Sequence, residues 1–365
     1  MYNENYSSPN VLEVNLSNFK HNIKEIKKLV KNDVEIMPII KANAYGTYLN
    51  TQIDIINEFN IVGVASVSEG IFLRNLGFKK DIFILNQPYI EEITNIIKYN
   101  LIVGISSNEF IDNLSNIDSS IKIHLEIGTG MGRTGINPFR TKEVIEKILQ
   151  NKNIVIDGIY THLSSADIDY EYTFNQLKNF NIAIDIAKKL VNTIRYIHSS
   201  ASNGIINFPN SYYNLVRPGI ILYGYPSSND TYQKINILPT CTLKSKVTFL
   251  KTVSKNTSIG YGRSFITNKE MTIATIPIGY ADGIKRCLSN KGSILINGKK
   301  ANIIGNICMD SFMVDVTHIE DIKLNDDVYI WDNDKITLES IAKDANTINY
   351  EILCNISNRI PRKFI

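Results

Sequence analysis

Short runs of apolar, mostly β-branched residues recur along the first two thirds of the 365-residue chain. Because the runs are continuously apolar rather than alternating, they are typical of strands buried on both faces, as in a parallel sheet. Most of the segments between them carry the spacing of amphipathic helices. Eight such repeats predict a (β/α)8 barrel of the TIM type. A doubly wound sheet is the alternative, but it normally has fewer strands and a glycine-rich first turn. The runs lie at residues 34–40, 61–66, 81–85, 101–106, 121–127, 155–162, 195–201 and 215–224.

Near residue 235 the pattern changes to short strands in quick succession. Residues 242–253 alternate between apolar and polar positions, and Asn297-Gly298 is a strong signal for a two-residue hairpin loop. The chain therefore predicts two domains, a barrel over 12–235 and an all-β domain over 236–365. Residues 1–11 are left free to pack with the second domain. Further β segments are predicted at 271–278, 293–304, 312–316 and 328–331, and helical ends at 337–345 and 349–356.

Composition narrows the class of protein without identifying it. Hydrophobic residues make up 44% and charged residues 21% of the chain, as in ordinary soluble enzymes. A net charge of +3 argues against a broad nucleic-acid-binding surface. No apolar run predicts a membrane helix, and the polar N-terminus does not resemble a secretion signal. The four cysteines form no CxxC pair, so we expect neither disulfides nor a metal site, and a reducing cytoplasm fits best.

Side chains that follow the strands of a barrel meet at one end, which is the catalytic face. Here they supply an amine, two guanidiniums, an imidazole and a hydroxyl. No pair of carboxylates suited to glycoside hydrolysis stands out among them. Lys41 ends a buried strand, and partial desolvation beside other cations would lower its pKa and let it form a Schiff base. Taken alone, it is more often a surface lysine. The candidates are Lys41, Asn86, Gln87, Arg133, His162, Ser202 and Arg217.

A series of sequence blocks resembles the alanine racemases, which are fold-type III amino-acid racemases that use pyridoxal 5'-phosphate. The blocks occur in the family's order and span nearly the whole chain. The resemblance implies a barrel followed by a β-domain, in agreement with the architecture predicted above. It also implies racemisation of L-alanine to D-alanine for peptidoglycan. The blocks are PIIKANAYG (38–46), GTGMGRTGI (128–136), THLSSAD (161–167), VRPGIILYG (216–224), IGYGRSF (259–265), PIGYADG (277–283), NICMDSFMVD (306–315) and TINYEILCNISNRIPR (347–362).

The resemblance also implies a two-base mechanism. Lys41 would hold pyridoxal phosphate covalently and act on one face of the substrate, and Tyr261 would act on the other face. In this family the tyrosine comes from the partner subunit, so the active site would exist only in a homodimer. Arg217 would face the pyridine nitrogen of the cofactor, and His162 would support Arg217.

The remaining roles concern the cofactor phosphate and the substrate. Arg133 would contact the phenolic oxygen of the cofactor and the substrate carboxylate, and Met309 would offer a backbone N–H to that carboxylate. Tyr280 and Tyr350 would line the channel by which the substrate reaches the site. The phosphate-binding positions would be Tyr45, Ser202, Gly219, Ile220 and Tyr350.

Several positions depart from the family pattern. Glu126 stands where many members have a lysine that becomes carbamylated, and a glutamate there supplies a negative charge directly. We therefore expect Glu126 to orient Arg133. None of the departures removes a catalytic group, but together they leave the preferred amino acid open. The others are Thr47, Gly128, Ala201 and Asn306.

Three alternatives remain at this point. A serine or mixed serine/alanine racemase of the same fold, as in resistance-associated enzymes, commonly carries a membrane domain, and a trimmed part of one would look like this chain. Tyr350 narrows the pocket mouth as in alanine enzymes and favours alanine. A non-catalytic pyridoxal-phosphate-binding protein would lack the β-domain and the equivalent of Tyr261. A decarboxylase of this architecture would place an acid where Arg217 stands.

Overall fold

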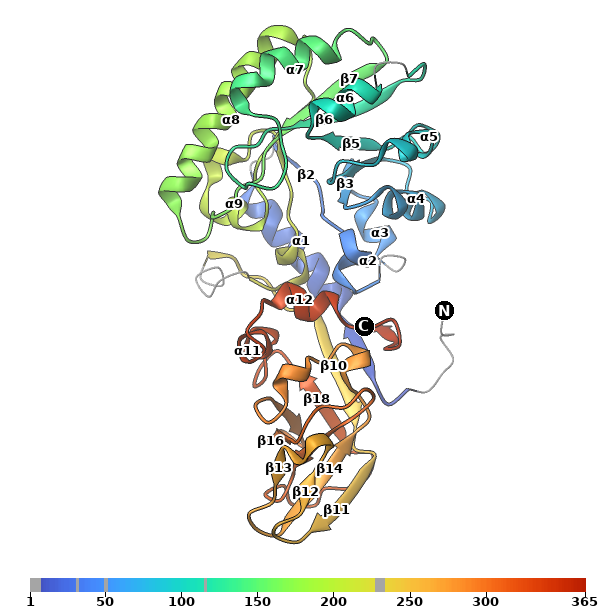
Figure 1. The fold of residues 1–365 in the computed structure, drawn as a ribbon, viewed down its shortest axis with the longest axis vertical. Coiled ribbons are helices and arrows are strands. Elements are labelled where there is room, and N and C mark those ends of the chain that lie inside the picture. Colours follow the sequence, from blue (N-terminus) through green and yellow to red (C-terminus); the bar gives the residue numbers. More distant parts are fainter. Residues whose placement is uncertain (1–7, 31–32, 49–51, 115–116, 227–233) are drawn as a thin grey trace. The chain divides into compact units, whose positions relative to one another are not determined.

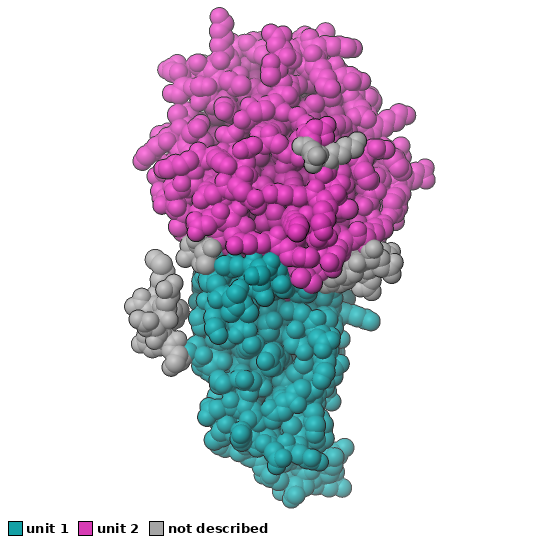
Figure 2. Space-filling model, turned by 180° about the vertical axis from the view of Figure 1, so that it is seen from behind, with its two compact units in different colours: residues 1–18, 45–48, 239–365 teal, residues 19–44, 49–238 magenta. Residues whose placement is uncertain are grey.

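The computed structural model describes residues 8–30, 33–48, 52–114, 117–226 and 234–365. Figure 2 shows that the chain divides into two compact units. The barrel unit contains residues 19–44 and 49–238, and the β unit contains the described residues up to Asn18, Tyr45–Tyr48 and Pro239–Ile365. Of the N-terminal residues 1–11, the first seven lie outside the described residues. Within the described part of the chain, no helix is long and apolar enough to cross a membrane.

The barrel unit is a closed ring of eight parallel strands. Strands β3 to β8 form one sheet in chain order, and β2 (Glu35–Ile36) pairs with β9 (Leu215–Val216). Parallel bridges between Ile39 and Gly63 and between Ala201 and Arg217 join this pair to the two ends of the sheet. The predicted (β/α)8 barrel is confirmed. The six strands of the sheet are β3 (Ile61–Val64), β4 (Asp81–Ile84), β5 (Ile102–Ile105), β6 (Ile121–Glu126), β7 (Ile154–Tyr160) and β8 (Tyr196–His198).

Helices follow the barrel strands along the chain (Figure 1). Their apolar stripes turn inward, as the spacing predicts: Val144, Ile145 and Ile148 of α7 are all buried. Burying one such aliphatic side chain stabilises the fold by about 1.5–3 kcal/mol. The helices are α1 (Leu16–Leu29), α3 (Ile53–Ile56), α4 (Val67–Asn75), α5 (Ile93–Lys98), α6 (Asn108–Leu114), α7 (Thr141–Ile148), α8 (Tyr170–Leu190) and α9 (Ser202–Asn207), with short 3-10 turns η1 (Ile90–Glu92), η2 (Pro138–Arg140), η3 (Pro209–Ser211) and η4 (Ile220–Tyr223).

The β unit is built on one nine-stranded sheet of order β11-β14-β17-β16-β15-β18-β10-β1-β19. The predicted hairpin joins β15 to β16, with Ile296 opposite Lys299. Its loop residues Asn297 and Gly298 both have positive φ, as a type I′ turn requires. The strands are β1 (Val11–Val14), β10 (Cys241–Lys246), β11 (Phe249–Val253), β14 (Met271–Ile276), β15 (Ser293–Ile296), β16 (Lys299–Ile304), β17 (Phe312–Asp315), β18 (Asp327–Trp331) and β19 (Arg362–Phe364).

The N-terminal strand β1 belongs to this sheet, between β10 and β19. Its residues Val11–Val14 therefore belong to the β unit, although the sequence divides the domains at residue 12. Smaller elements complete the unit. They are β12 (Ser258–Ile259), β13 (Phe265–Ile266), the 3-10 turns η5 (Tyr261–Arg263), η6 (Tyr280–Asp282) and η7 (Arg286–Leu288), and the helices α11 (Leu338–Asp344) and α12 (Asn349–Cys354).

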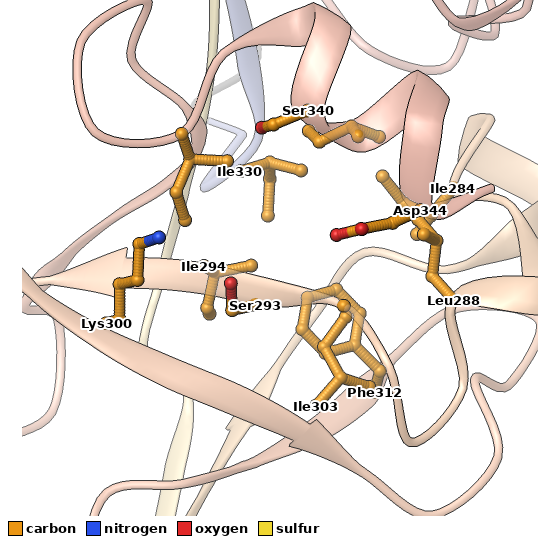
Figure 3. A pocket seen from close by; sticks show the side chains of 13 residues that line it. Ile284, Leu288, Ser293, Ile294, Lys300, Ile303, Phe312, Ile330, Ser340 and Asp344 are labelled. Atoms are coloured by element: carbon orange, nitrogen blue, oxygen red, sulfur yellow. The ribbon is translucent and has the colours of Figure 1, made fainter.

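A cavity of about 70 Å³ lies within the β unit between α11 and the sheet. Figure 3 shows Ser340 and Asp344 on the helical side and Ile294 and Ile303 on the strands opposite. Its lining is mostly aliphatic, which gives a bound polar molecule few partners. The cavity contains none of the side chains with predicted catalytic or binding roles.

Candidate active site

Lys41 follows β2 and begins a turn with unusual backbone geometry. The next four residues, Ala42, Asn43, Ala44 and Tyr45, all have φ between 53° and 55°. This is the left-handed helical region, which costs a residue with a Cβ roughly 1–2 kcal/mol each. Ala44 and Tyr45 are buried, so packing holds the turn in place. Such strain in a run of non-glycine residues is found mainly where a function depends on the local geometry.

Four predicted residues of the barrel unit act on one another electrostatically at the mouth of the barrel. Burial, together with the positive charges of Arg217, Arg133 and Lys41, lowers the pKa of His162 to about 3. His162 follows β7, Arg133 follows β6 and Arg217 follows β9. Arg133 is exposed. The barrel therefore collects three cations around one neutral imidazole, which favours the binding of an anionic ligand.

Arg217 is almost completely buried and is held by neutral acceptors. Its Nη1 donates to Nδ1 of His198 at 2.6 Å. Its Nη2 donates to the carbonyls of Thr161 at 2.9 Å and Ser199 at 3.0 Å, and lies 3.3 Å from Nδ1 of His162. Burial lowers the pKa of Arg217 to about 10, so the side chain stays protonated at neutral pH. Its Nε makes no hydrogen bond within the described residues and is free for a ligand.

A chain of hydrogen bonds runs from Arg217 into the barrel. A guanidinium can only donate, so Nδ1 of His198 accepts and the proton of that ring lies on Nε2. This Nε2 lies 2.9 Å from Nδ1 of His124 and donates to it. The proton of His124 is thereby assigned to Nε2, which points at Asp157 Oδ2, 3.6 Å away. Arg217 thus dictates the tautomers of both histidines, and both are neutral because burial lowers their pKa values.

The buried histidines predict a loss of stability in acid. The folded-state pKa of His162, about 3, lies below its ordinary value of 6.5. Protons therefore bind preferentially to the unfolded chain, and stability present above pH 6.5 is lost as the pH falls toward 3. The slope is about 1.4 kcal/mol per pH unit, or about 2 kcal/mol between pH 6.5 and pH 5 for His162 alone. His124 and His198 act in the same direction.

Urea unfolding at about pH 7.5 and about pH 5 measures this effect. His162→Gln is the control, because it removes one titrating group and should reduce the acid-induced loss by roughly 2 kcal/mol. Equal losses in the variant and the original chain would show that His162 is not held neutral.

Ser202 and Gly219 lie together at the beginning of two short helices. Ser202 is buried at the first residue of α9, and its Oγ accepts the backbone N–H of Gly219 at 3.1 Å. Gly219 precedes η4, which begins at Ile220. The first N–H groups of a helix have no partner inside it and are suited to anions.

The predicted site residues of the β unit form two groups. Tyr45 and Tyr350 pack together with ring centroids 6.2 Å apart, and burial raises the pKa of Tyr45 well above its usual range. Tyr261, Tyr280 and Met309 are instead exposed, with Tyr261 at 74%. Two backbone hydrogen bonds join the loop of Tyr280 to the loop of Met309. The N–H of Tyr280 donates to the carbonyl of Cys308, and the N–H of Ala281 donates to the carbonyl of Met309, both at 3.0 Å.

Glu126 lies inside the barrel mouth and has its own partner. Its Oε1 accepts the hydroxyl of Thr134 at 2.9 Å. Burial raises the pKa of Glu126, while Thr134 and the charge of Arg133 oppose the rise. Arg133 makes no ion pair with it among the described residues. Its expected role in orienting Arg133 stays a prediction, supported only by attraction at longer range.

Sequence reasoning missed the buried groups that contact the predicted site residues from inside the barrel. His124 and His198 stand in apolar strand runs and looked like ordinary core positions. Gln87, a candidate at the mouth, accepts the N–H and hydroxyl of Ser106 and so joins two loops. The only available signal for the histidine chain was the presence of polar residues at buried strand positions.

Comparisons with known proteins cover nearly the whole chain. The family model described as "Alanine racemase, N-terminal domain" matches residues 14–227, and that described as "Alanine racemase, C-terminal domain" matches residues 240–364. The alanine racemase of Halothermothrix orenii is 37% identical and that of Methanococcus maripaludis 38%, with at least 98% of each chain covered.

Solved structures of alanine racemases are similar to this chain over nearly its whole length. The alanine racemase of Clostridium difficile 630 has a TM-score of 0.93 at 34% identity, covering 99% of this chain and 96% of that one. The alanine racemase of Bacillus anthracis with bound L-Ala-P has a TM-score of 0.92 at 28% identity, covering 99% of this chain and 96% of that one.

Proposed function

The chain belongs to the alanine racemase family, and we propose that its reaction takes place at the mouth of the barrel with pyridoxal phosphate as cofactor. The enzyme is an isomerase that interconverts L- and D-alanine. The serine racemase that the sequence left open is not favoured, since the relatives described above are alanine racemases. One observation carries the choice of site: Arg217 Nη2 lies 3.3 Å from Nδ1 of His162, and the charges of Arg217, Arg133 and Lys41 all lower the pKa of His162. The D-alanine formed would serve peptidoglycan synthesis.

The donor set of the barrel unit fits pyridoxal phosphate. Lys41 would hold the cofactor covalently. The phosphate would lie at Ser202, Gly219 and Ile220, where a buried hydroxyl meets the beginning of η4. Arg217 would present its free Nε to the pyridine nitrogen. The family pattern also implies phosphate-binding roles for Tyr45 and Tyr350, which pack on each other within the β unit.

The reaction removes the proton from one face of the substrate Cα and delivers another proton to the opposite face. The cofactor, when bound, supplies the electron sink that makes this proton acidic. Lys41 and Tyr261 would be the two acid/base groups, one on each face. A positioned acid or base contributes on the order of 10²–10⁴ in rate. In one direction of the reaction Lys41 would accept a proton from Cα while Tyr261 donates one to the opposite face. In the reverse direction the two residues would exchange these roles.

Arg217 would favour racemisation over competing reactions. With a pKa of about 10 it keeps its own proton at neutral pH and cannot accept another. Arg217 would therefore leave the pyridine nitrogen of a bound cofactor without a positive charge, which would make the ring a weaker electron sink. Rapid return of a proton to Cα is thereby favoured over transamination. His162 and His198 hold Arg217 in this position.

Substrate recognition would depend on the positive charge of Arg133 and on the channel that leads to the site. Arg133 makes no hydrogen bond within the described residues, so its guanidinium is available to the cofactor's phenolic oxygen and to the substrate carboxylate. The backbone N–H of Met309 would bind the same carboxylate. Tyr280 and Tyr350 would line the substrate channel, and the width of the Tyr350 side chain would favour the methyl group of alanine.

A homodimer would bring Tyr261 to the site. Tyr261, Tyr280 and Met309 are large side chains exposed on the β unit, at 74%, 43% and 53%. Exposed apolar side chains gathered on one unit are typical of a surface that another protein covers. We propose that a second copy of the chain covers them and receives Tyr261 in its own barrel site.

The test is loss of optical activity by the purified protein with pyridoxal phosphate, offered L-alanine and L-serine separately at equal concentration. We expect faster conversion of alanine. Faster conversion of serine would overturn the choice of substrate, and no conversion of either would overturn the function. Omitting pyridoxal phosphate after dialysis against hydroxylamine is the control for the cofactor.

A further inference from the structure

The turn that carries Lys41 is held from outside by one carboxylate. Glu69 lies in the first turn of α4, after β3. Its Oε1 accepts the backbone N–H of Ala42 at 2.6 Å. Its Oε2 accepts the N–H of Ala65 at 2.7 Å and that of Ser66 at 3.3 Å. Both oxygens of one side chain therefore tie the residue after Lys41 to the end of the neighbouring strand.

We propose that Glu69 is a positioning residue for Lys41. Ala42 is the first of the four left-handed residues, so its N–H marks the point where the backbone leaves ordinary geometry. Later in the turn the N–H of Ala44 donates to the carbonyl of Ile40 at 3.0 Å, whereas the N–H of Ala42 has the Glu69 carboxylate as its acceptor. By fixing this amide, Glu69 fixes the direction in which the Lys41 side chain leaves the backbone.

A carboxylate suits this place because it only accepts hydrogen bonds. All three partners of Glu69 are N–H donors, and they approach both of its oxygens. The amide of glutamine has one acceptor oxygen and one NH2 group, so either Ala42 or Ala65 would face a second donor. The carboxylate is itself placed by a capping box, in which Ser66 Oγ accepts the N–H of Glu69 at 3.3 Å. Helix α4 and the Lys41 turn thus share one anchor.

Glu69→Gln tests the anchor, and Ser66→Ala is its matched control. Both variants weaken the capping box of α4, but only Glu69→Gln alters the acceptor for Ala42. Hydrogen exchange of the backbone amides in residues 40–46 is measured by mass spectrometry on the full-length protein saturated with pyridoxal phosphate. We expect exchange about ten-fold faster in Glu69→Gln and unchanged in Ser66→Ala, because a charge-assisted hydrogen bond is lost only in the former.

The consequence for catalysis rests on the proposed function. We expect kcat for alanine to fall about 10- to 100-fold in Glu69→Gln with a smaller change in KM, since displacing a reacting group by about 1 Å has effects of this size. Ser66→Ala should keep kcat within about three-fold of the original.

The two readouts separate the possible failures. Unchanged exchange in Glu69→Gln would overturn the proposal whatever the activity, as would equal effects of both variants on exchange and kcat. Faster exchange with an unchanged kcat would leave Glu69 as an anchor of the turn but overturn its role in positioning Lys41. An original chain that racemises neither amino acid would instead contradict the proposed function.

Discussion

Replacing Lys41 with alanine is expected to lower kcat for alanine racemisation on the order of 10³-fold or more. On the proposed mechanism, the variant would lose both the covalent attachment of the cofactor and one of the two acid/base groups. The fold should survive, because the Lys41 side chain is only partly buried and leaves no large cavity. Polarimetry gives the rate, and the thermal midpoint of the same sample shows that the barrel is intact.

Lys41→Arg is a second variant, which separates the effect of the positive charge from that of covalent attachment. It keeps the positive charge and the length of the side chain, but a guanidinium stays protonated and does not attack a carbonyl carbon at neutral pH. We expect it to be as inactive as Lys41→Ala. If Lys41→Arg retained more than about a tenth of the activity, charge alone would explain the residue and the covalent role would be wrong.

The barrel could be predicted from the sequence because its strands are buried on both faces and therefore read as continuous apolar runs. Two runs are longer than the strands they contain. β2 ends at Ile36 and β9 at Val216, and each is followed two residues later by a proline, Pro38 or Pro218. A proline has no N–H to give to a ladder. Carbonyls still accept across these gaps, as Pro218 does from Ile39 at 2.9 Å.

The gathering of Lys41, Arg133 and Arg217 around His162 could also be predicted from the sequence, because side chains at the strand ends of a barrel meet at one face. The buried histidine pair behind these residues could not be predicted from the sequence. His124 and His198 are 74 residues apart in the chain and become partners only because β6, β7 and β8 are neighbours. The left-handed turn after Lys41 could not be predicted from the sequence for a different reason. KANAYG contains a single glycine, and nothing in the spacing of its residues requires positive φ.

Tyr261→Phe is expected to lower kcat for racemisation by about 10²–10⁴, because phenylalanine has no proton to exchange with the substrate. Tyr261 is exposed and its backbone carbonyl accepts Asn306 Nδ2 at 2.8 Å, so the substitution should leave the local fold unchanged. The rate is measured in both directions, with L-alanine and with D-alanine, and the thermal midpoint again reports on folding.

Mixing Tyr261→Phe with Lys41→Ala tests whether the two bases come from different subunits. In a two-fold symmetric dimer with shared sites, a hybrid has one site that carries both substitutions and one that carries neither. Random exchange of equal amounts makes half of the dimers hybrids, so about a quarter of all sites should be intact. Two nearly inactive proteins would then recover about a quarter of the original activity. If each site were built within a single subunit, no hybrid could contain an intact site. Activity that stays at the level of the parents, while mass spectrometry shows that hybrids have formed, would therefore place Lys41 and Tyr261 in the same subunit.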